Sequence, residues 1–360
     1  TFPYLLFMAL IALMGGMLNS LHRFAAAAAA PIVLNIVLIG TLLGARHGVF
    51  PESLIPSSAH ALAWGVFVAG VGQFFWIAYA CHRADILFYM PRPRLTLGVR
   101  RLIVLMVPGI IGAGVVQINL VIDVVLASTL TEGSVSYLYY ADRVNQLPLG
   151  VVGVAIGIAL LPLLTRQLRN GEAEAARDSQ NRAIEFALML SAPATAALII
   201  AAEPIVTVLF QRGEFDVVAT TATAAALRAF AIGLPAYVLI KSLTPGYFAR
   251  QDTKTPVQIA IAAVVLNILL ALVLMQFLAH AGIALATAIA AWLNAIALGV
   301  VLLRRGHLSF DDRLRRRTPR IVAAAVLMGA VVYAGVEGLA GPLAGTEADR
   351  IPALVALVVA

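Results

Sequence analysis

The chain has 360 residues, of which 61% are hydrophobic and 12% charged, and its mean hydropathy is +0.95. A soluble domain usually carries about 25% charged residues, so this composition excludes an ordinary soluble protein and indicates an all-α polytopic membrane protein. The chain has 25 Lys and Arg against 18 Asp and Glu. The positions of the basic residues indicate whether this excess serves nucleic-acid binding or membrane topology.

Ten apolar runs are long enough to cross a bilayer, because a spanning helix needs about 20 mainly apolar residues. In chain order they are Phe2–Leu21, Ala27–Leu43, Ala59–Ala80, Leu102–Ala127, Ser134–Leu164, Ala183–Ala202, Ala219–Ile240, Pro256–Leu278, Gly282–Leu303 and Ile321–Ala340. An eleventh begins near Ile351. The runs lack the short alternating segments of membrane barrels, so we expect about eleven helical spans.

The basic residues alternate from one connecting loop to the next. The odd-numbered loops hold one, five, four, three and seven Lys and Arg, 20 in all, whereas the even-numbered loops hold only Arg46, Arg212 and Arg350. By the positive-inside rule the odd loops are cytoplasmic, and Thr1 lies on the outer side. The basic residues therefore set topology and can contact anionic lipid, and we expect no nucleic-acid binding.

Two basic residues, Arg143 and Arg228, fall inside predicted spans. A charge near the bilayer centre costs at least about 2.5–3.5 kcal/mol and usually faces a cavity or a partner. Arg143 lies about nine residues into its span, roughly 13 Å deep. Asp142 precedes it, but adjacent helical residues do not face each other. We expect each charge to meet another helix or a ligand, and a ligand site is favoured over a structural ion pair.

The same span contains residues that bear on helix packing. Pro148 removes a backbone donor one turn after Arg143, so a kinked or loosened helix is expected there. Gly150, Gly153 and Gly157 would let a neighbouring helix approach closely.

Asp123 is a further buried-charge candidate. It lies four residues after Asn119, on the same helix face, so the carboxylate and amide could hold a small cation or a proton. The alternative is that Asp123 pairs with Arg143 or Arg228 across helices. For Arg228 itself an interhelical ion pair is favoured, and Asn267 is expected to hold helices together.

Catalytic motifs are missing from the sequence. Its six His residues form no metal-binding spacing, and no phosphate-binding loop or nucleophile elbow appears. The single cysteine, Cys81, is expected to be a small buried thiol. We therefore expect a transporter and not an enzyme, with no cofactor and no metal site beyond a possible sodium ion at Asp123.

Several stretches together resemble one known family. They include YLYYADRVNQLPLGV from Tyr137, LFQRGEF from Leu209 and SLTPGYFARQDTKTPV from Ser242. In order and spacing they are similar to the MurJ (MviN) family, which belongs to the superfamily of multidrug, oligosaccharidyl-lipid and polysaccharide exporters. The resemblance covers nearly the whole chain.

The resemblance implies a fourteen-helix fold, with two six-helix lobes around a central cavity and two extra C-terminal helices. The spans here would be the fourth to the fourteenth, so the chain is expected to lack the first three helices and the end of the last. Residues 1–82 would complete the N-terminal lobe and 83–101 form a basic cytoplasmic linker. Residues 102–303 would form the C-terminal lobe, 304–320 a basic cytoplasmic loop and 321–360 the extra helix pair.

The implied function is flipping of lipid II, the undecaprenyl-pyrophosphate-linked peptidoglycan precursor, across the bacterial cytoplasmic membrane. Transport would proceed by alternating access, coupled to membrane potential or to sodium. Arg143 matches a cavity arginine that would bind substrate, and Asp142 matches its acidic neighbour. Asp123 with Asn267 is the candidate coupling site. Expected partners are lipid II, membrane lipids and other cell-wall synthesis proteins.

The stretch Ala249–Pro256 joins two spans on the cytoplasmic side and has two interpretations. It could form a cytoplasmic gate, whose residues would be Arg250, Gln251, Asp252 and Lys254. It could instead start a helix, with Thr253 or Thr255 as N-cap and Pro256 in the first turn. The helix start is favoured.

Three other functions compete with lipid II transport. A flippase for another undecaprenyl-linked glycan would use Arg143 in the same way. A cation-coupled multidrug exporter would need an acidic cavity, which Arg143 argues against. A membrane glycosyltransferase or phosphatase would need clustered catalytic acids, which the sequence lacks.

Overall fold

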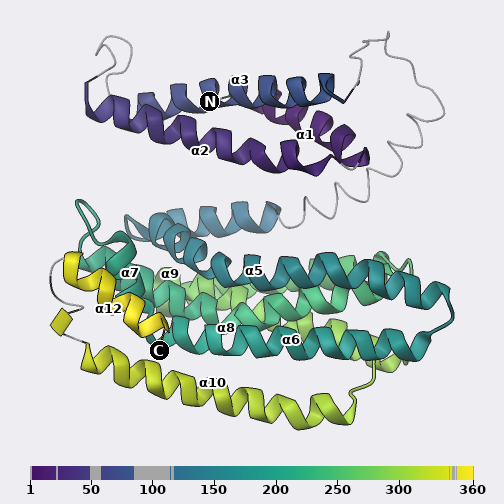
Figure 1. Cartoon of the computed structure of the whole chain (residues 1–360). Helices are drawn as coiled ribbons and strands as arrows, with labels where there is room; N and C mark the ends of the chain where they lie inside the picture. Colours follow the sequence, from purple (N-terminus) through teal and green to yellow (C-terminus); the bar gives the residue numbers. More distant parts are fainter. Residues whose placement is uncertain are drawn as a thin grey trace. The chain divides into compact units, whose positions relative to one another are not determined.

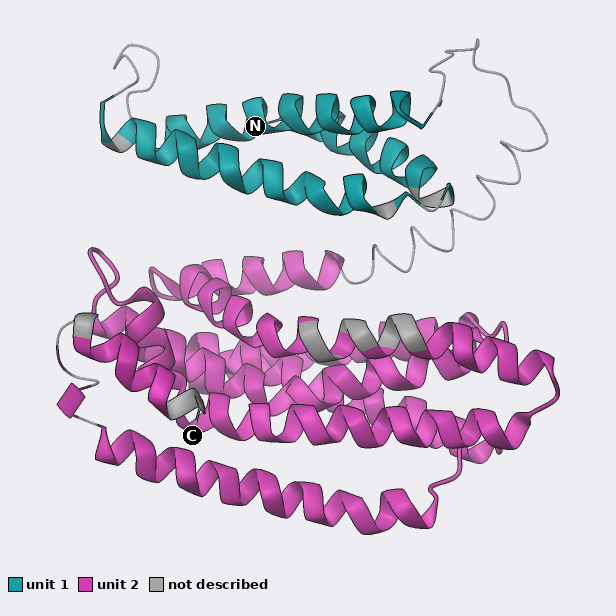
Figure 2. Cartoon of the chain, in the orientation of Figure 1, with its two compact units in different colours: residues 1–96 teal, residues 97–360 magenta. Residues whose placement is uncertain are grey.

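The structure is a computed structural model that describes residues 2–21, 23–48, 58–84, 114, 117–339, 341–342, 345 and 347–359. Every regular element in these residues is an α-helix, as predicted (Figure 1). Six of the described helices are long and apolar enough to cross a membrane, which agrees with the predicted polytopic class. The chain divides into two compact units, Thr1–Thr96 and Leu97–Ala360 (Figure 2). The predicted lobes and their boundaries stay predictions.

Unit 1 is a three-helix unit of α1 (Tyr4–Ser20), α2 (Phe24–Arg46) and α3 (Ser58–His82). Its core includes Met14, Leu18, Ala30, Ile77 and the predicted buried thiol of Cys81. Polar side chains also link its helices. The Tyr4 hydroxyl donates to Gln73 Oε1 at 3.1 Å, and Gln73 Nε2 donates to the Ala30 carbonyl at 2.8 Å. Such interhelical hydrogen bonds stabilise packing where lipid surrounds the helices.

Unit 2 contains the remaining described helices. They are an unlabelled helix over Gln117–Ser128, α5 (Ser134–Arg169), α6 (Ala173–Ile200), α7 (Ala202–Phe210), α8 (Val217–Phe248), α9 (Lys254–Arg304), α10 (Asp312–Gly338) and α12 (Glu347–Val359). α8 is the central helix and packs against α5, α6, α7 and α9. Small residues let these helices approach closely: a Cβ on Gly233 of α8 would lie 2.9 Å from Ala288 Cα of α9.

α9 contains the two predicted spans Pro256–Leu278 and Gly282–Leu303, and its backbone leaves helical geometry between them. Ala279 has φ 47° and ψ −130°, which breaks the helix. A Cβ on Gly282 would lie 2.3 Å from the Leu274 carbonyl oxygen, so the break requires glycine there. One long helix by hydrogen-bond pattern is therefore two helical segments joined by a sharp change of direction.

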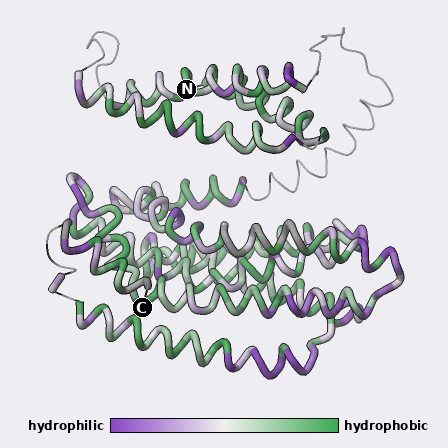
Figure 3. The backbone as a smooth tube through the Cα atoms, in the orientation of Figure 1, coloured by the Kyte–Doolittle hydropathy of each residue, from purple (hydrophilic) through white to green (hydrophobic). Residues whose placement is uncertain are grey.

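Several helices extend beyond the predicted apolar runs. α5 continues to Arg169 and α6 begins at Ala173, so the predicted loop between Leu164 and Ala183 is mostly helical. α8 continues to Phe248, past the predicted end at Ile240. An apolar run ends at the first polar residues, but the hydrogen bonds of the helix continue through those residues. The helices are therefore longer than the runs. Figure 3 shows these hydrophilic residues gathered toward the helix ends of unit 2.

α10 also begins earlier than predicted. It starts at Asp312, inside the stretch 304–320 that was expected to be loop, because Asp311 Oδ1 caps it by accepting from the Leu314 N–H at 2.8 Å. α7 was not predicted at all, since nine residues are too few for a span. Of the predicted run Leu102–Ala127, residues 102–113, 115 and 116 lie outside the described residues, as do residues 85–101 of the predicted linker.

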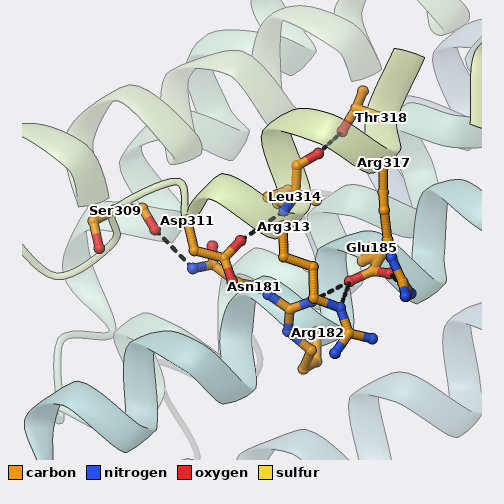
Figure 4. Close-up of polar contacts among 9 residues, drawn as sticks. All are labelled: Asn181, Arg182, Glu185, Ser309, Asp311, Arg313, Leu314, Arg317 and Thr318. Carbon is orange, nitrogen blue, oxygen red and sulfur yellow. Dashed lines mark hydrogen bonds and ion pairs between the residues drawn. The ribbon is translucent and has the colours of Figure 1, made fainter. Parts of the chain in front are cut away.

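An ionic cluster holds the start of α10 on α6 (Figure 4). Glu185 of α6, whose side chain is only 8% exposed, accepts from Arg317 Nη1 at 2.5 Å and pairs with Arg313 Nε at 3.2 Å. Arg182 contacts Glu185 and also Asp311. Two carboxylates therefore neutralise part of the charge of three arginines that come from two helices.

Candidate functional site

Unit 2 contains a cavity of about 510 Å³ between the helix Gln117–Ser128, α5, α8 and α9, which we call the polar cavity. Its polar lining residues are Asn119, Asp123, Tyr139, Asp142, Asn145, Gln146, Tyr237, Lys241 and Thr287. The rest of its wall is apolar, for example Leu138 and Phe230. Three of the residues singled out from sequence, Asn119, Asp123 and Asp142, therefore lie around one space.

Asp142 lies on the cavity face of α5. Tyr139, Asp142 and Gln146 follow one another at helical spacing of three and four residues, so one face of α5 presents all three to the cavity. Gln146 Nε2 donates to Asp142 Oδ2. Among the ion pairs of the described residues there is none between Asp142 and Arg143. The described hydrogen-bond partner of Asp142 is thus on its own helix, whereas a partner on another helix or a ligand was expected.

Arg143 points to a different side of α5 from Asp142. Its side chain is exposed, it does not line the polar cavity, and its guanidinium carbon lies 4.8 Å from the centre of the Tyr139 ring. Such a cation–π contact contributes about 0.5–1 kcal/mol at an exposed site. Within the described residues Arg143 forms no ion pair with a carboxylate. The expected partner on another helix is therefore not found there.

Asp123 forms a polar cluster with two amides. Asn119 Nδ2 donates to Asp123 Oδ2 at 3.0 Å, within one helix. Asn267 Nδ2, from α9, lies 2.9 Å from Asn119 Oδ1 and 3.2 Å from Asp123 Oδ1. The structure thus brings together the three residues Asp123, Asn119 and Asn267, although Asn267 is 144 residues from Asp123 in the chain.

The alternative pairing of Asp123 with an arginine is wrong for Arg228. Arg228 Nη2 lies 3.5 Å from Glu203 Oε2 of α7, and its Nε donates to the Ile199 carbonyl at 3.3 Å. This is the interhelical ion pair that was favoured for Arg228 from sequence. Arg228 does not line the polar cavity, so it is not a cavity residue in this structure.

The Asp123 cluster has donor chemistry that fits a monovalent cation. Asn267 Oδ1 is buried and has no hydrogen-bond partner among the described residues. Asp123 supplies one carboxylate, and Thr287, whose hydroxyl donates to the Ile283 carbonyl at 3.1 Å, lines the polar cavity with it. Hard cations prefer such oxygen ligands. No group of three or more His, Cys, Asp or Glu side chains that could hold a metal occurs in the described part of the chain, and one negative charge suits a singly charged ion.

Lys241 is a cavity residue that the sequence analysis placed in a loop. It is exposed, lies seven residues before the end of α8, and lines the polar cavity with Asp142 and Tyr237. The predicted apolar run ended at Ile240, just before the lysine, yet α8 continues through Pro245 to Phe248. The four-residue spacing of Tyr237 and Lys241 was the one signal that both share a face.

The residues after Arg143 only partly follow their predicted roles. α5 continues through Pro148 as one helix, and the kink or loosening expected there stays a prediction. A Cβ on Gly150 would meet nothing within 4 Å, so Gly150 widens the polar cavity and does not pack closely against a helix. Gly153 does allow close approach, because its Cβ would lie 3.5 Å from Lys241 Cγ. The surroundings of Gly157 lie outside the described residues.

The stretch Ala249–Pro256 forms a capped helix start, but the cap is Asp252, not a threonine. Asp252 Oδ1 accepts from the Thr255 N–H at 3.0 Å, whereas the side chain of Thr253 makes no capping bond. Arg305, at the other end of α9, donates to Asp252 Oδ2 at 2.6 Å and to Thr255 Oγ1 at 3.1 Å. Hydrogen bonds from Thr255, with Arg305 alongside, lower the pKa of Asp252 to about 2.

The other predicted gate residues lie at the same end of unit 2. Arg250 Nη1 donates to the Gly246 carbonyl at 2.7 Å, and burial lowers the pKa of Arg250. Gln251 has a positive φ of 61° and is exposed, as is Lys254. These contacts fix a turn between α8 and α9, and a gating role for the four residues stays a prediction.

Comparison with known proteins gives a consistent set of relatives. The profile of the family "Lipid II flippase MurJ" matches residues 1–343. A probable lipid II flippase MurJ of Rhizobium meliloti is 47% identical over 342 residues, covering 95% of this chain and 63% of the relative. One of Rhizobium tropici is 48% identical over 332 residues, covering 92% and 61%. The chain thus spans less than two thirds of the length of these relatives.

A solved structure has the same fold. It is "Lipid II flippase MurJ, inward closed conformation", which superposes with a TM-score of 0.77 at 24% sequence identity. The match covers 99% of this chain and 70% of that one. The helical order seen here is therefore shared with a protein of known structure.

Proposed function

The chain belongs to the lipid II flippase MurJ family, and from that premise we propose that the protein moves lipid II from the cytoplasmic to the outer leaflet. It is a multi-pass membrane protein, in which the two lobes would rock around a central site by alternating access. Its place would be the bacterial cytoplasmic membrane, where it would supply peptidoglycan synthesis. It would act as a transporter without catalysing a reaction.

The observation that supports this function best is Arg143. It is an exposed cation roughly 13 Å into a span, and it forms no ion pair with an acid among the described residues. The pyrophosphate of lipid II is anionic and must cross a medium of low dielectric constant. A guanidinium matches phosphate geometry with paired hydrogen bonds, so Arg143 would offset the cost of removing water from the pyrophosphate. Asp142 and Lys241 would line the adjoining polar cavity.

The test uses the full-length protein in a strain depleted of its own copy. Lipid II that reaches the outer leaflet is measured with an externally added enzyme that cleaves only exposed lipid II. We expect wild type to restore cleavage and Arg143→Ala to reduce it by at least about tenfold, which corresponds to roughly 1.4 kcal/mol of lost pyrophosphate stabilisation.

Arg169→Ala is the matched control, because Arg169 is an exposed arginine in the last turn of the same helix. It should transport like wild type at equal membrane levels. If Arg143→Ala also transports normally, Arg143 is not on the substrate path. If folded wild type fails altogether, the substrate is another lipid-linked glycan.

We also propose that sodium couples transport through Asp123. The unpartnered Asn267 Oδ1 beside the Asp123 carboxylate supports this, since both are oxygen ligands and one lies on each of two helices that could move apart. In the same assay, replacing sodium by choline should slow wild type. Asp123→Asn should be slow in both media, and Asp178→Asn, an exposed residue of α6, should respond like wild type. Sodium-independent transport by wild type would leave membrane potential as the energy source.

A further inference from the structure

A second cavity of unit 2 lies along α10, on the side away from the ionic cluster. It measures about 510 Å³, and its wall comes from α6, α8, the second half of α9 and α10. We call it the α10 groove and define it by Leu188, Leu243, Trp292, Gly299, Phe310 and Arg315. It shares no lining residue with the polar cavity.

The α10 groove is apolar apart from one free cation. The Thr318 hydroxyl at its edge donates to the Leu314 carbonyl at 2.8 Å, and Trp292 Nε1 donates to the Ile232 carbonyl at 2.9 Å. The guanidinium of Arg315 has no hydrogen bond or ion pair with any described residue, including Asp312 three residues earlier. Among the described residues that line the groove there is no acid, so its charge is +1.

The arginines on either side of Arg315 in α10 have a different environment, because they are paired with an acid. Arg313 and Arg317 point to the other side of the helix, where Glu185 neutralises them (Figure 4). Arg315 lies between them in sequence, but adjacent helical positions point in different directions, and it reaches the groove instead. α10 thus has an arginine on its groove side that no described acid pairs with.

The length of the groove matches one leaflet of a bilayer. Along α9 its wall runs from Trp292 to Leu303, a rise of about 16 Å and roughly half of a 30 Å hydrocarbon core. Arg315 lies in the first turn of α10, beside the α9–α10 connection that the charge pattern assigns to the cytoplasm. A cation therefore sits at the headgroup end of a slot with the depth of one acyl chain.

We propose that the α10 groove binds one anionic glycerophospholipid of the cytoplasmic leaflet, with its phosphate on Arg315 and an acyl chain along α9. A guanidinium pairs well with phosphate, and basic pockets between membrane helices on the cytoplasmic side recognise anionic headgroups. The apolar wall contacts the chain and excludes a free phosphate ion as the ligand. This proposal does not rest on lipid II transport.

The test is native mass spectrometry of the full-length protein in detergent with added phosphatidylglycerol. Wild type should retain one tightly bound lipid, and Arg315→Gln should bind it about fivefold more weakly, as expected for one lost basic contact. Arg316→Gln is the matched control, because Arg316 is the next residue, is exposed and does not line the groove. It should bind like wild type.

Three further measurements test the contributions of the lipid headgroup and of the acyl chain to binding separately. Phosphatidylcholine should bind more weakly than phosphatidylglycerol to wild type and equally to Arg315→Gln. Inorganic phosphate should not displace the lipid. Gly299→Leu should also weaken binding, because a Cβ at Gly299 meets only Leu243 Cδ1, at 3.9 Å, and the larger side chain would extend into the groove without a clash. The thermal unfolding temperature of each variant should stay near that of wild type.

Other outcomes would overturn the proposal. Equal binding by wild type and Arg315→Gln, or equal loss in Arg315→Gln and Arg316→Gln, would mean that the groove does not recognise a headgroup. Unchanged binding by Gly299→Leu would mean that the acyl chain of the lipid does not lie in the α10 groove. A preference for a polyprenyl phosphate over phosphatidylglycerol would replace the proposed lipid by a carrier lipid.

Discussion

At the scale of single residues, neighbours in sequence have different surroundings. Asp142 faces the polar cavity and accepts from Gln146, while Arg143 lies over Tyr139. Asp252 caps α9, while the hydroxyl of Thr253 makes no capping bond. Each difference follows from helix geometry, because a shift of one residue turns a side chain by about 100° and moves it to another partner.

Asp252 carries a pH prediction. Its pKa is about 2 in the folded protein, below the ordinary value of about 3.9, so its contribution to stability is complete above pH 4 and is lost as the pH falls toward 2. Asp252→Asn keeps an oxygen for the Thr255 N–H but has no charge to titrate. In thermal unfolding of purified protein, wild type should lose more stability than Asp252→Asn between about pH 4 and 2.

Two variants check this account. Asp178→Asn removes an exposed carboxylate and should keep the wild-type pH dependence. Asp252→Ala should lose about 1 kcal/mol even at neutral pH, because the cap itself is gone. If Asp252→Asn shows the full wild-type loss at low pH, other carboxylates are responsible.

At the scale of elements, α10 is held to α6 by ion pairs, and apolar contacts hold it to α8 and α9. Glu185 gathers three guanidiniums near the start of α10, and Leu314 is buried against Leu243 and Leu302 in a neighbouring cluster. The basic residues that signal topology in the sequence are therefore also structural. They fix one helix end, and Arg315 is left free for another partner.

Glu185→Gln should loosen this attachment. The variant leaves three arginines without their charge partner, and we expect a loss of about 2 kcal/mol. This is less than the 3–5 kcal/mol of a fully buried pair, because the arginine side chains are 31%, 54% and 50% exposed. Hydrogen exchange should become faster in the first turns of α10. Glu174→Gln, at an exposed position in the first turn of α6, should leave exchange unchanged, and unchanged exchange in Glu185→Gln would contradict the structural role.

At the scale of the whole molecule, many large apolar side chains are exposed, and alanine makes up a large part of the buried core. Leu269, Phe277, Val326 and Leu327 are all more than half exposed, whereas the core of α8 is rich in fully buried alanine. This arrangement suits helices in lipid, since acyl chains solvate large apolar side chains and helix association depends on close approach of small residues. Polar groups inside the helix bundle of unit 2 lie at interhelical contacts and in the polar cavity.

The sequence by itself determined the helical membrane class, most span positions and the alternation of charge, because each depends on local composition and length. It also identified Asp123, Asn119 and Asn267, since polar residues inside apolar runs are conspicuous. Only the tertiary structure showed that these three meet, that Lys241 lines the same cavity as Asp123 and Asn119, and that Arg228 pairs with Glu203. Such contacts depend on helix rotation and on where helices end, and neither is set by hydropathy.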